Sequence, residues 1–260
     1  MNFREKWKAT VERKKSVLCI NLDPAELKQR DELNIKQSDK IQWSLDIIDQ
    51  TAQYAAAIKP NRQYYKDLSR QDMLKINQYA KDRGLLSIDD SKISDIGSTN
   101  DAALFHAVEE GFDAITYAPF PGNLADTCQM ALKRNIGLIP LVLMSNPEYK
   151  AIKSLEINQM KYWQYLAIES EKHQASGIVV GAPSTKNHIS HDELNAIAES
   201  ISQDMTVLVP GIGAQGGAFA PIIEAFGKRS IISVGRDIAY HESPKERAAY
   251  YFKEINRLLF

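Results

Sequence analysis

The chain has 260 residues, of which 44% are hydrophobic, and its 32 basic residues nearly balance its 33 acidic ones. That length is ample for one domain with a sizeable core, and a formal charge of -1 gives no reason to expect a nucleic acid or a membrane surface as a partner. No apolar run approaches the roughly 20 residues that cross a bilayer, and the charged segment Met1–Lys8 lacks the apolar stretch of a signal peptide. Two cysteines, Cys19 and Cys128, suggest neither a disulfide framework nor a metal site, so we expect a cytoplasmic protein.

Eight short apolar runs follow one another along the chain, and a segment of helical length follows each of them. Continuous apolar runs of this length are typical of strands buried in a parallel sheet. The predicted strands are residues 17–22, 55–58, 84–88, 113–117, 137–143, 177–180, 205–209 and 230–234.

Several of the intervening segments carry helix signals. Apolar residues from Ile41 to Ala52 are spaced to line one helical face. Ser190 and Glu193 have the spacing of a capping box, and Ser243 precedes a proline at a first helical position. The predicted helices are residues 41–52, 69–84, 99–110, 155–172, one that begins at Ser190, and 243–260.

The strand count and the chain length together predict a single (β/α)8 TIM barrel, of the α/β class, formed by residues 1–260 as one domain. No linker or low-complexity stretch separates the units. A doubly wound sheet could share the alternation, but such a sheet seldom needs eight units.

Polar residues stand at the carboxyl ends of the predicted strands, which in a barrel converge on the rim where active sites lie. Each one alone has a structural explanation, such as a turn or a solvated strand end. Their shared placement instead predicts one site. These residues are Asp23, Lys59, Asp90, Lys92, Asp95, Ser145, Gln215 and Arg236.

The segment from Asp90 to Asp95 gathers three of these charges directly after an apolar run. On an extended strand, Asp90 and Lys92 share one face. Asp95 is expected beyond the strand, in the turn that leads to the next helix. Acid and base side by side at a strand end indicate catalysis, although a solvated charge run in a loop is the alternative.

The loop Pro210–Gly217 follows the seventh strand and contains four glycines, which allow the backbone to approach a ligand and to point N–H groups at an anion. Gln215 adds a neutral donor, and Arg236 after the eighth strand adds a charged one. Barrels often bind phosphate at these two loops. We therefore predict a phosphate site, with a flexible turn as the alternative; the spacing matches neither a Walker loop nor a dinucleotide fingerprint.

These residues together resemble the orotidine 5'-phosphate decarboxylase family, in order from Asp23 to Arg236. Asp90-x-Lys92-x-x-Asp95 by itself is shared with a wider superfamily of phosphosugar decarboxylases and synthases, whereas the glutamine-bearing glycine loop is more specific. Asn21, in the first strand, departs from the small or apolar residue expected there. The other matching segments are Lys59-Pro60-Asn61, Ile96-Gly97-x-Thr99, Met144-Ser145, Gly181–Thr185 and Val234–Arg236.

The resemblance implies a catalytic tetrad of Lys59, Asp90, Lys92 and Asp95. It also implies a homodimer with shared active sites, because Asp95, Ile96 and Thr99 would reach the site of the neighbouring subunit. Asp23 would bind the ribose hydroxyls with Lys59, Ser145 the pyrimidine, and the residues of the last two strand ends the phosphate. The implied substrate-binding residues are Asp23, Ile96, Thr99, Ser145, Pro210, Gln215, Gly235 and Arg236.

The implied reaction is decarboxylation of orotidine 5'-monophosphate to uridine 5'-monophosphate, the last step of de novo pyrimidine biosynthesis, with no cofactor and no metal. One alternative is a Mg²⁺-dependent sugar-phosphate decarboxylase or synthase of the same superfamily, against which Lys59 and the Gln215 loop argue. Another is a non-catalytic barrel that binds a phosphate ligand, against which the complete tetrad argues.

His188 and His191 are expected to be solvated loop residues.

Overall fold

A closed barrel of eight parallel strands forms the centre of the protein, which we describe from a computed structural model covering residues 1–30, 35, 39–185, 187–213 and 217–260. Around the barrel the strands follow the order β1-β10-β9-β8-β5-β4-β3-β2, so chain neighbours pair and the last barrel strand closes on the first. The strands are β1 (Leu18–Leu22), β2 (Ala57–Pro60), β3 (Leu86–Ile93), β4 (Ala114–Tyr117), β5 (Gly137–Leu143), β8 (Gly177–Val180), β9 (Thr206–Ile212) and β10 (Ser230–Val234). The predicted TIM barrel is confirmed.

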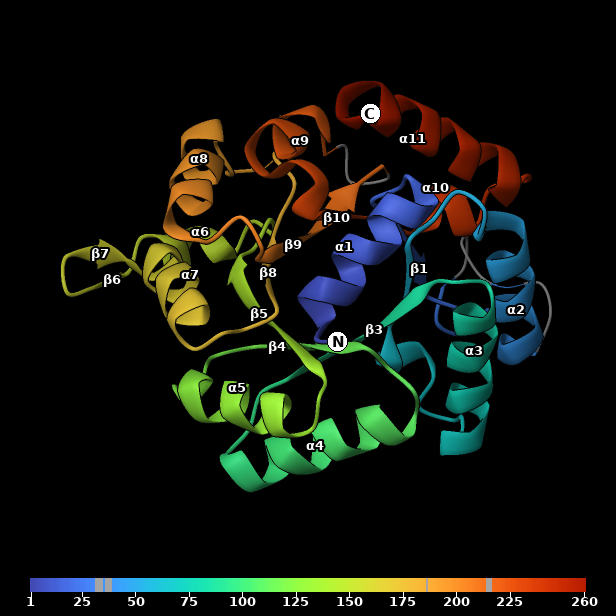
Figure 1. Ribbon diagram of the computed structural model, residues 1–260, viewed down its shortest axis with the longest axis horizontal. Helices are drawn as coiled ribbons and strands as arrows, with labels where there is room; N and C mark the ends of the chain where they lie inside the picture. Colours follow the sequence, from blue (N-terminus) through green and yellow to red (C-terminus); the bar gives the residue numbers. More distant parts are fainter. Residues whose placement is uncertain (31–34, 36–38, 186, 214–216) are drawn as a thin grey trace.

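Helices surround the barrel and bury their apolar faces against the strands (Figure 1). The amphipathic spacing noted between Ile41 and Ala52 places Ile48 of α2 fully in the core, and Ile76 of α3 is fully buried there too. The helices are α1 (Phe3–Lys14), α2 (Lys40–Thr51), α3 (Arg70–Asp82), α4 (Gly97–Glu109), α5 (Leu124–Lys133), α6 (Tyr149–Lys153), α7 (Tyr162–Lys172), α8 (His191–Ser200), α9 (Ala220–Phe226), α10 (Arg236–Ala239) and α11 (Pro244–Leu259), with the 3-10 turns η1 (Arg62–Tyr64) and η2 (Gly227–Arg229).

The first helix, α1, is not among the predicted elements and lies across the amino-terminal end of the barrel (Figure 1). Phe3 packs so closely on Gly137 that a Cβ there would lie 2.8 Å from the Phe3 Cβ. Trp7 is buried beside it and donates its indole N–H to the Lys228 carbonyl at 3.2 Å. Because α1 covers this end, the strand ends that carry the predicted site open at the opposite one.

The predicted helix 155–172 is wrong in its first part. A two-stranded hairpin of β6 (Glu156–Ile157) and β7 (Met160–Lys161) occupies that part, projects from the body in Figure 1, and delays the start of α7 to Tyr162. Asn158 and Gln159 both have positive φ, at 52° and 63°, as a tight two-residue hairpin turn requires. Local turn chemistry therefore overrides the helical spacing.

Two further boundaries differ where the chain approaches the predicted site. β3 extends to Ile93, so Asp90 and Lys92 lie inside the strand, and α4 begins at Gly97 instead of Thr99. Asp95 does lie in the turn between them, as predicted.

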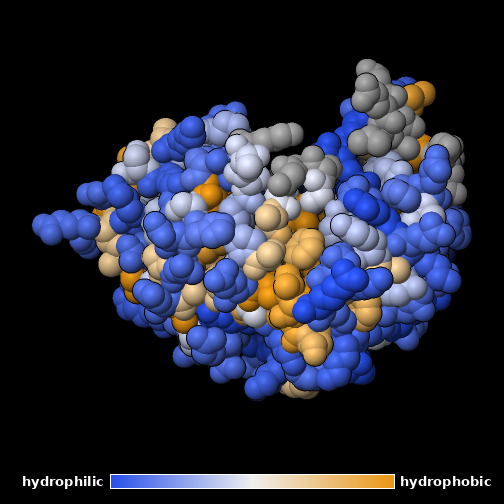
Figure 2. Space-filling model, turned by 90° about the horizontal axis from the view of Figure 1, so that it is seen from above, coloured by the Kyte–Doolittle hydropathy of each residue, from blue (hydrophilic) through white to orange (hydrophobic). Residues whose placement is uncertain are grey.

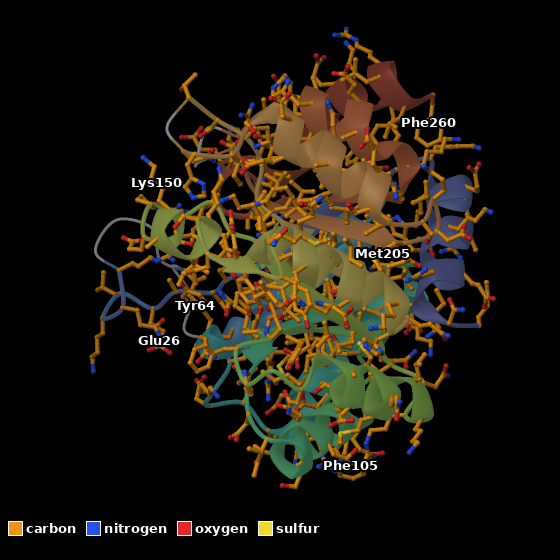
Figure 3. All side chains as sticks on the ribbon, turned by 90° about the vertical axis from the view of Figure 1, so that its left-hand side faces the viewer. Glu26, Tyr64, Phe105, Lys150, Met205 and Phe260 are labelled. Carbon is orange, nitrogen blue, oxygen red and sulfur yellow. The ribbon has the colours of Figure 1, made fainter. Side chains whose placement is uncertain are left out.

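The loops after the strands gather at one end of the molecule. In Figure 3, Glu26, Tyr64 and Lys150, which follow β1, β2 and β5, lie on the side opposite α1. The face shown in Figure 2 is mostly hydrophilic with one apolar patch, in keeping with a chain in which 25% of residues are charged. Within the described ranges, we find no helix with the length and apolar character needed to cross a membrane.

Candidate active site

A cavity of about 510 Å³ opens at the carboxyl ends of the strands. Its volume lies in the range of sites that bind small molecules. Six residues predicted from the sequence line it: Asp23, Lys59, Asp90, Lys92, Ser145 and Pro210. These residues come from five segments far apart in the chain, at or after β1, β2, β3, β5 and β9, which barrel closure brings together.

Asp90 stands at the centre of the charged part of this cavity. One of its carboxylate oxygens accepts a hydrogen bond from Lys59 Nζ, and the other accepts from Lys92 Nζ at 2.5 Å. The Thr116 hydroxyl lies 3.3 Å from the same oxygen that Lys92 contacts. Asp90 and Lys92 thus share one face of β3, as the sequence predicts.

The two lysines decide the ionisation of Asp90. Burial by itself would raise the pKa of this carboxyl, but the ammonium groups of Lys59 and Lys92 outweigh it and hold that pKa well below its usual range. Burial would likewise lower the pKa of Lys59, yet the carboxylates of Asp90 and Asp23 raise it. Asp90 and Lys59 therefore remain charged at neutral pH. The pKa of Asp23 is raised by burial, an effect that Lys59 partly offsets.

Lys92 combines an accessible side chain with an unusual backbone. Its side chain is 43% exposed, whereas that of Lys59 is 5% exposed, so the Lys92 ammonium is the one more open to a ligand in the cavity. Its φ of 52° is left-handed, and the pairing of β3 with β4 shifts register between Asp89 and Ile93. The Lys92 N–H donates to the Thr116 hydroxyl at 2.9 Å. A non-glycine residue in this region is rare and is often found at functional sites.

Asp95, Ile96 and Thr99 lie apart from the described lining of the cavity and face solvent. Ile96 is 65% exposed, which is unusual for so large an apolar side chain. Asn100 fixes the turn, because its side chain accepts from the Asp95 N–H at 3.1 Å and donates to the Asp95 carbonyl at 2.8 Å. Asn123 donates to the same carbonyl at 3.0 Å.

The predicted phosphate contacts are placed only in part. Arg236 is the first residue of α10 and Gly235 is the residue before it; neither is in the described lining of the cavity. Gly235 nevertheless packs against Asn21, which does line the cavity. A Cβ at Gly235 would lie 3.1 Å from Asn21 Nδ2. Asp237 anchors this short helix, because it accepts from Arg247 Nε at 2.9 Å and from the Tyr251 hydroxyl. Gln215 lies outside the described residues.

Several cavity residues are absent from the sequence-based prediction. Asn21 and Thr116 are polar side chains inside otherwise apolar strands, and that interruption is the signal that points to them. Asn146 and Asn187 lie in loops, where asparagine is too common to stand out.

His191 is exposed, as predicted, whereas His188 is a half-buried loop residue that also makes contacts. Its Nε2 lies 3.2 Å from the Asn146 carbonyl, and its ring stacks on Tyr149 at a centroid distance of 6.2 Å. It therefore connects the loop after β8 with the loop after β5.

Comparison with known proteins places the chain in a family. Residues 16–251 match the family model described as Orotidine 5'-phosphate decarboxylase / HUMPS family. The chain belongs to this family. The match includes every strand of the barrel and all the predicted site residues.

Relatives in this family resemble the chain over nearly its whole length. An orotidine 5'-phosphate decarboxylase of Janthinobacterium sp. is 32% identical over 92% of this chain and 90% of that protein. One of Herpetosiphon aurantiacus is 29% identical over 92% of this chain and 89% of that protein. The solved structure of Leishmania donovani OMP decarboxylase shares the fold, with a TM-score of 0.82 at 23% identity, and the match covers 100% of this chain and 99% of that one.

As a member of this decarboxylase family, the protein is a carboxy-lyase of pyrimidine biosynthesis that acts on orotidine 5'-monophosphate. The residues that perform the reaction have to be argued from the site itself. Within the part of the chain that the structure describes, no three His, Cys, Asp or Glu side chains form a group that could hold a metal ion.

Proposed function

We propose that the protein converts orotidine 5'-monophosphate to uridine 5'-monophosphate and CO2 with its own side chains alone, and that Lys92 is the proton donor. The observation that carries this proposal is the row of Lys59, Asp90 and Lys92 on the wall of the cavity. The bond between C6 and the carboxylate breaks, and its electron pair stays on C6. The Lys92 ammonium stabilises that charge as it develops and then transfers a proton to C6.

Asp90 has two roles in this proposal. Its carboxylate would lie next to the substrate carboxylate and repel it. The bound substrate is therefore raised in energy relative to a transition state in which the carboxylate group becomes neutral CO2 and its negative charge moves to C6. It also accepts the hydrogen bonds that direct both lysine ammonium groups to one place. Lys59 balances the charge of Asp90 from the buried side.

The remaining cavity residues would bind the parts of the nucleotide that do not react. We assign the ribose hydroxyls to Asp23 and Lys59, the pyrimidine to Ser145, and the phosphate to the segments of Pro210, Gln215, Gly235 and Arg236. Asp23, Ser145 and Pro210 line the same cavity as Asp90, which supports the assignment. Phosphate binding remote from C6 can drive closure over the substrate and so assist the chemical step.

We further propose a homodimer in which Asp95, Ile96 and Thr99 of one subunit enter the site of the other. Their exposure in the single chain supports this, and so does the fixed backbone of the Asp95 turn. Asp95 would then complete the charged tetrad across the interface, and burial of Ile96 would favour association.

The whole chain would act as one decarboxylase domain in the cytoplasm. Its two cysteines support that compartment, because Cys19 and Cys128 are both free and buried.

The test is the ultraviolet absorbance change on addition of orotidine 5'-monophosphate, with and without EDTA. We expect conversion to the uridine nucleotide at the same rate in both. Loss of the reaction in EDTA and recovery with Mg²⁺ would instead indicate the metal-dependent chemistry of the superfamily. Nucleotide binding without turnover would indicate a barrel that has lost catalysis.

A further inference from the structure

The face of β3 that points away from the cavity carries a second carboxyl, Asp89, which the proposed mechanism does not use. Asp89 is only 4% exposed, and the Ser91 hydroxyl donates a hydrogen bond to its Oδ1. The charged groups that face it are Arg62 of η1, Glu110 at the end of α4, and its neighbour Asp90. Arg62 is itself paired with Glu110 at 3.0 Å.

The Asp89–Ser91 hydrogen bond lies next to the strained residue of the site. Lys92 follows Ser91 directly, and its φ of 52° falls within the irregular part of β3 between Asp89 and Ile93. Such a conformation persists only where the surroundings fix it from several sides. Thr116 fixes it on the inner face through the Lys92 N–H. The Asp89–Ser91 bond is the matching restraint on the outer face.

We propose that Asp89 and Ser91 are positioning residues for the decarboxylation, whose hydrogen bond holds Lys92 in the left-handed conformation that brings its Nζ to Asp90. The inference rests on the proposed role of Lys92. It adds two residues that never meet the substrate and that act on the reaction only through the backbone of Lys92.

The ionisation of Asp89 supports this role and gives it a signature. Burial raises the pKa of Asp89 to about 7, against the opposing effects of Ser91 and Arg62. Above that pH the acceptor is a carboxylate, which forms a stronger hydrogen bond with a hydroxyl than a neutral group does. The restraint on Lys92 therefore weakens as the pH falls through 7.

The first experiment compares Ser91→Ala with Ser94→Ala, an exposed serine on the other side of Lys92. We expect Ser91→Ala to lower kcat about 10- to 100-fold with KM nearly unchanged, because a small misplacement of a reacting group costs rate rather than affinity. Ser94→Ala should behave as wild type. Equal kcat values for the two variants would overturn the inference.

The second experiment follows kcat of wild type and Asp89→Asn from pH 6 to 8. The asparagine keeps a neutral acceptor for Ser91 at every pH, so the ratio of wild type to variant should rise with an apparent pKa near 7. A constant ratio would overturn the inference, and this measurement decides the matter even where Ser91→Ala fails to fold. Asp89→Ala, which has no acceptor, should be slower than Asp89→Asn.

Lys92→Ala separates this inference from the proposed function. An inactive Lys92→Ala together with an unaffected Ser91→Ala rejects only the positioning role. An active Lys92→Ala rejects the proposed proton donor and the positioning role with it.

Discussion

Lys92 is the residue on which the proposed chemistry depends most directly. Replacing it with alanine removes both the charge that stabilises the C6 carbanion and the proton that C6 receives. We expect Lys92→Ala to lower kcat/KM by about 10⁴-fold or more. Lys150→Ala, a change of an exposed lysine on the same side of the molecule (Figure 3), is the control and should have wild-type activity. Steady-state turnover of orotidine 5'-monophosphate measures both.

The raised pKa of Asp89 predicts that the stability of the protein, as well as its kcat, depends on pH. Its pKa is about 7 in the folded protein and about 4 in an unfolded chain, so the folded state holds the extra proton between these values. That contribution is complete below pH 4 and is lost as the pH rises through 7. The free energy of unfolding of wild type, relative to Asp89→Asn, should therefore fall by roughly 2–3 kcal/mol from pH 5 to pH 8. Urea titrations at several pH values measure the difference.

This result would separate positioning from ordinary structural support. A carboxylate kept in place for the sake of stability would lose activity and stability together on a change of pH. Here the protein with a charged Asp89 is expected to be less stable than the protein with a neutral Asp89, and yet to have the higher kcat. A pH-independent stability difference would show that Asp89 does not titrate in this range.

Among the elements, α10 is central to the proposed phosphate site, because Arg236 is its first residue and α11 holds it in place. A charged guanidinium that makes two hydrogen bonds to a phosphate contributes about 3 kcal/mol. Arg236→Ala should therefore lower kcat/KM about 100-fold and leave the thermal midpoint unchanged. Arg257→Ala on the exposed side of α11 is the control. Unchanged kcat/KM in Arg236→Ala would refute the phosphate assignment.

The β3–α4 connection presents charged side chains in two directions. Asp90 and Lys92 face the cavity of their own chain, and Asp95 follows only three residues after Lys92 but faces outward. The change of direction comes from the end of β3 and from the Asn100 side chain that closes the turn. One short segment can therefore supply residues to two sites in a dimer.

At the scale of the whole molecule, the proposed shared active sites predict complementation between two inactive variants. In a heterodimer of Lys92→Ala and Asp95→Ala chains, one site would contain both changes and the other neither. Random pairing of co-expressed chains should therefore restore about a quarter of wild-type activity. Each variant expressed alone is the control. No recovery in a mixture shown to contain heterodimers would mean that each subunit completes its own site.

The order of the strands and the position of the site could be read from the sequence. Parallel strands buried on both sides are continuous apolar runs, and polar residues such as Lys59 and Ser145 follow those runs directly. The hairpin before α7 could not be predicted from the sequence, because the helical spacing after Leu155 gave no sign that Asn158 and Gln159 would adopt positive φ. Figure 1 shows that this error lies far from the barrel centre and leaves the site unaffected.

The sequence by itself determined the barrel, through its eight apolar runs, and the charged motif from Asp90 to Asp95, through its spacing; the decarboxylase family came from the resemblance of these motifs to known ones. Only the tertiary structure decided that Thr116 lies beside Asp90 and that Asp89, on the opposite face of β3, is buried and accepts a hydrogen bond from Ser91. It also placed Asn21 beside Gly235 and α1 across the far end. These relations depend on strand register and barrel closure, which join residues distant in the chain and leave no mark on local sequence.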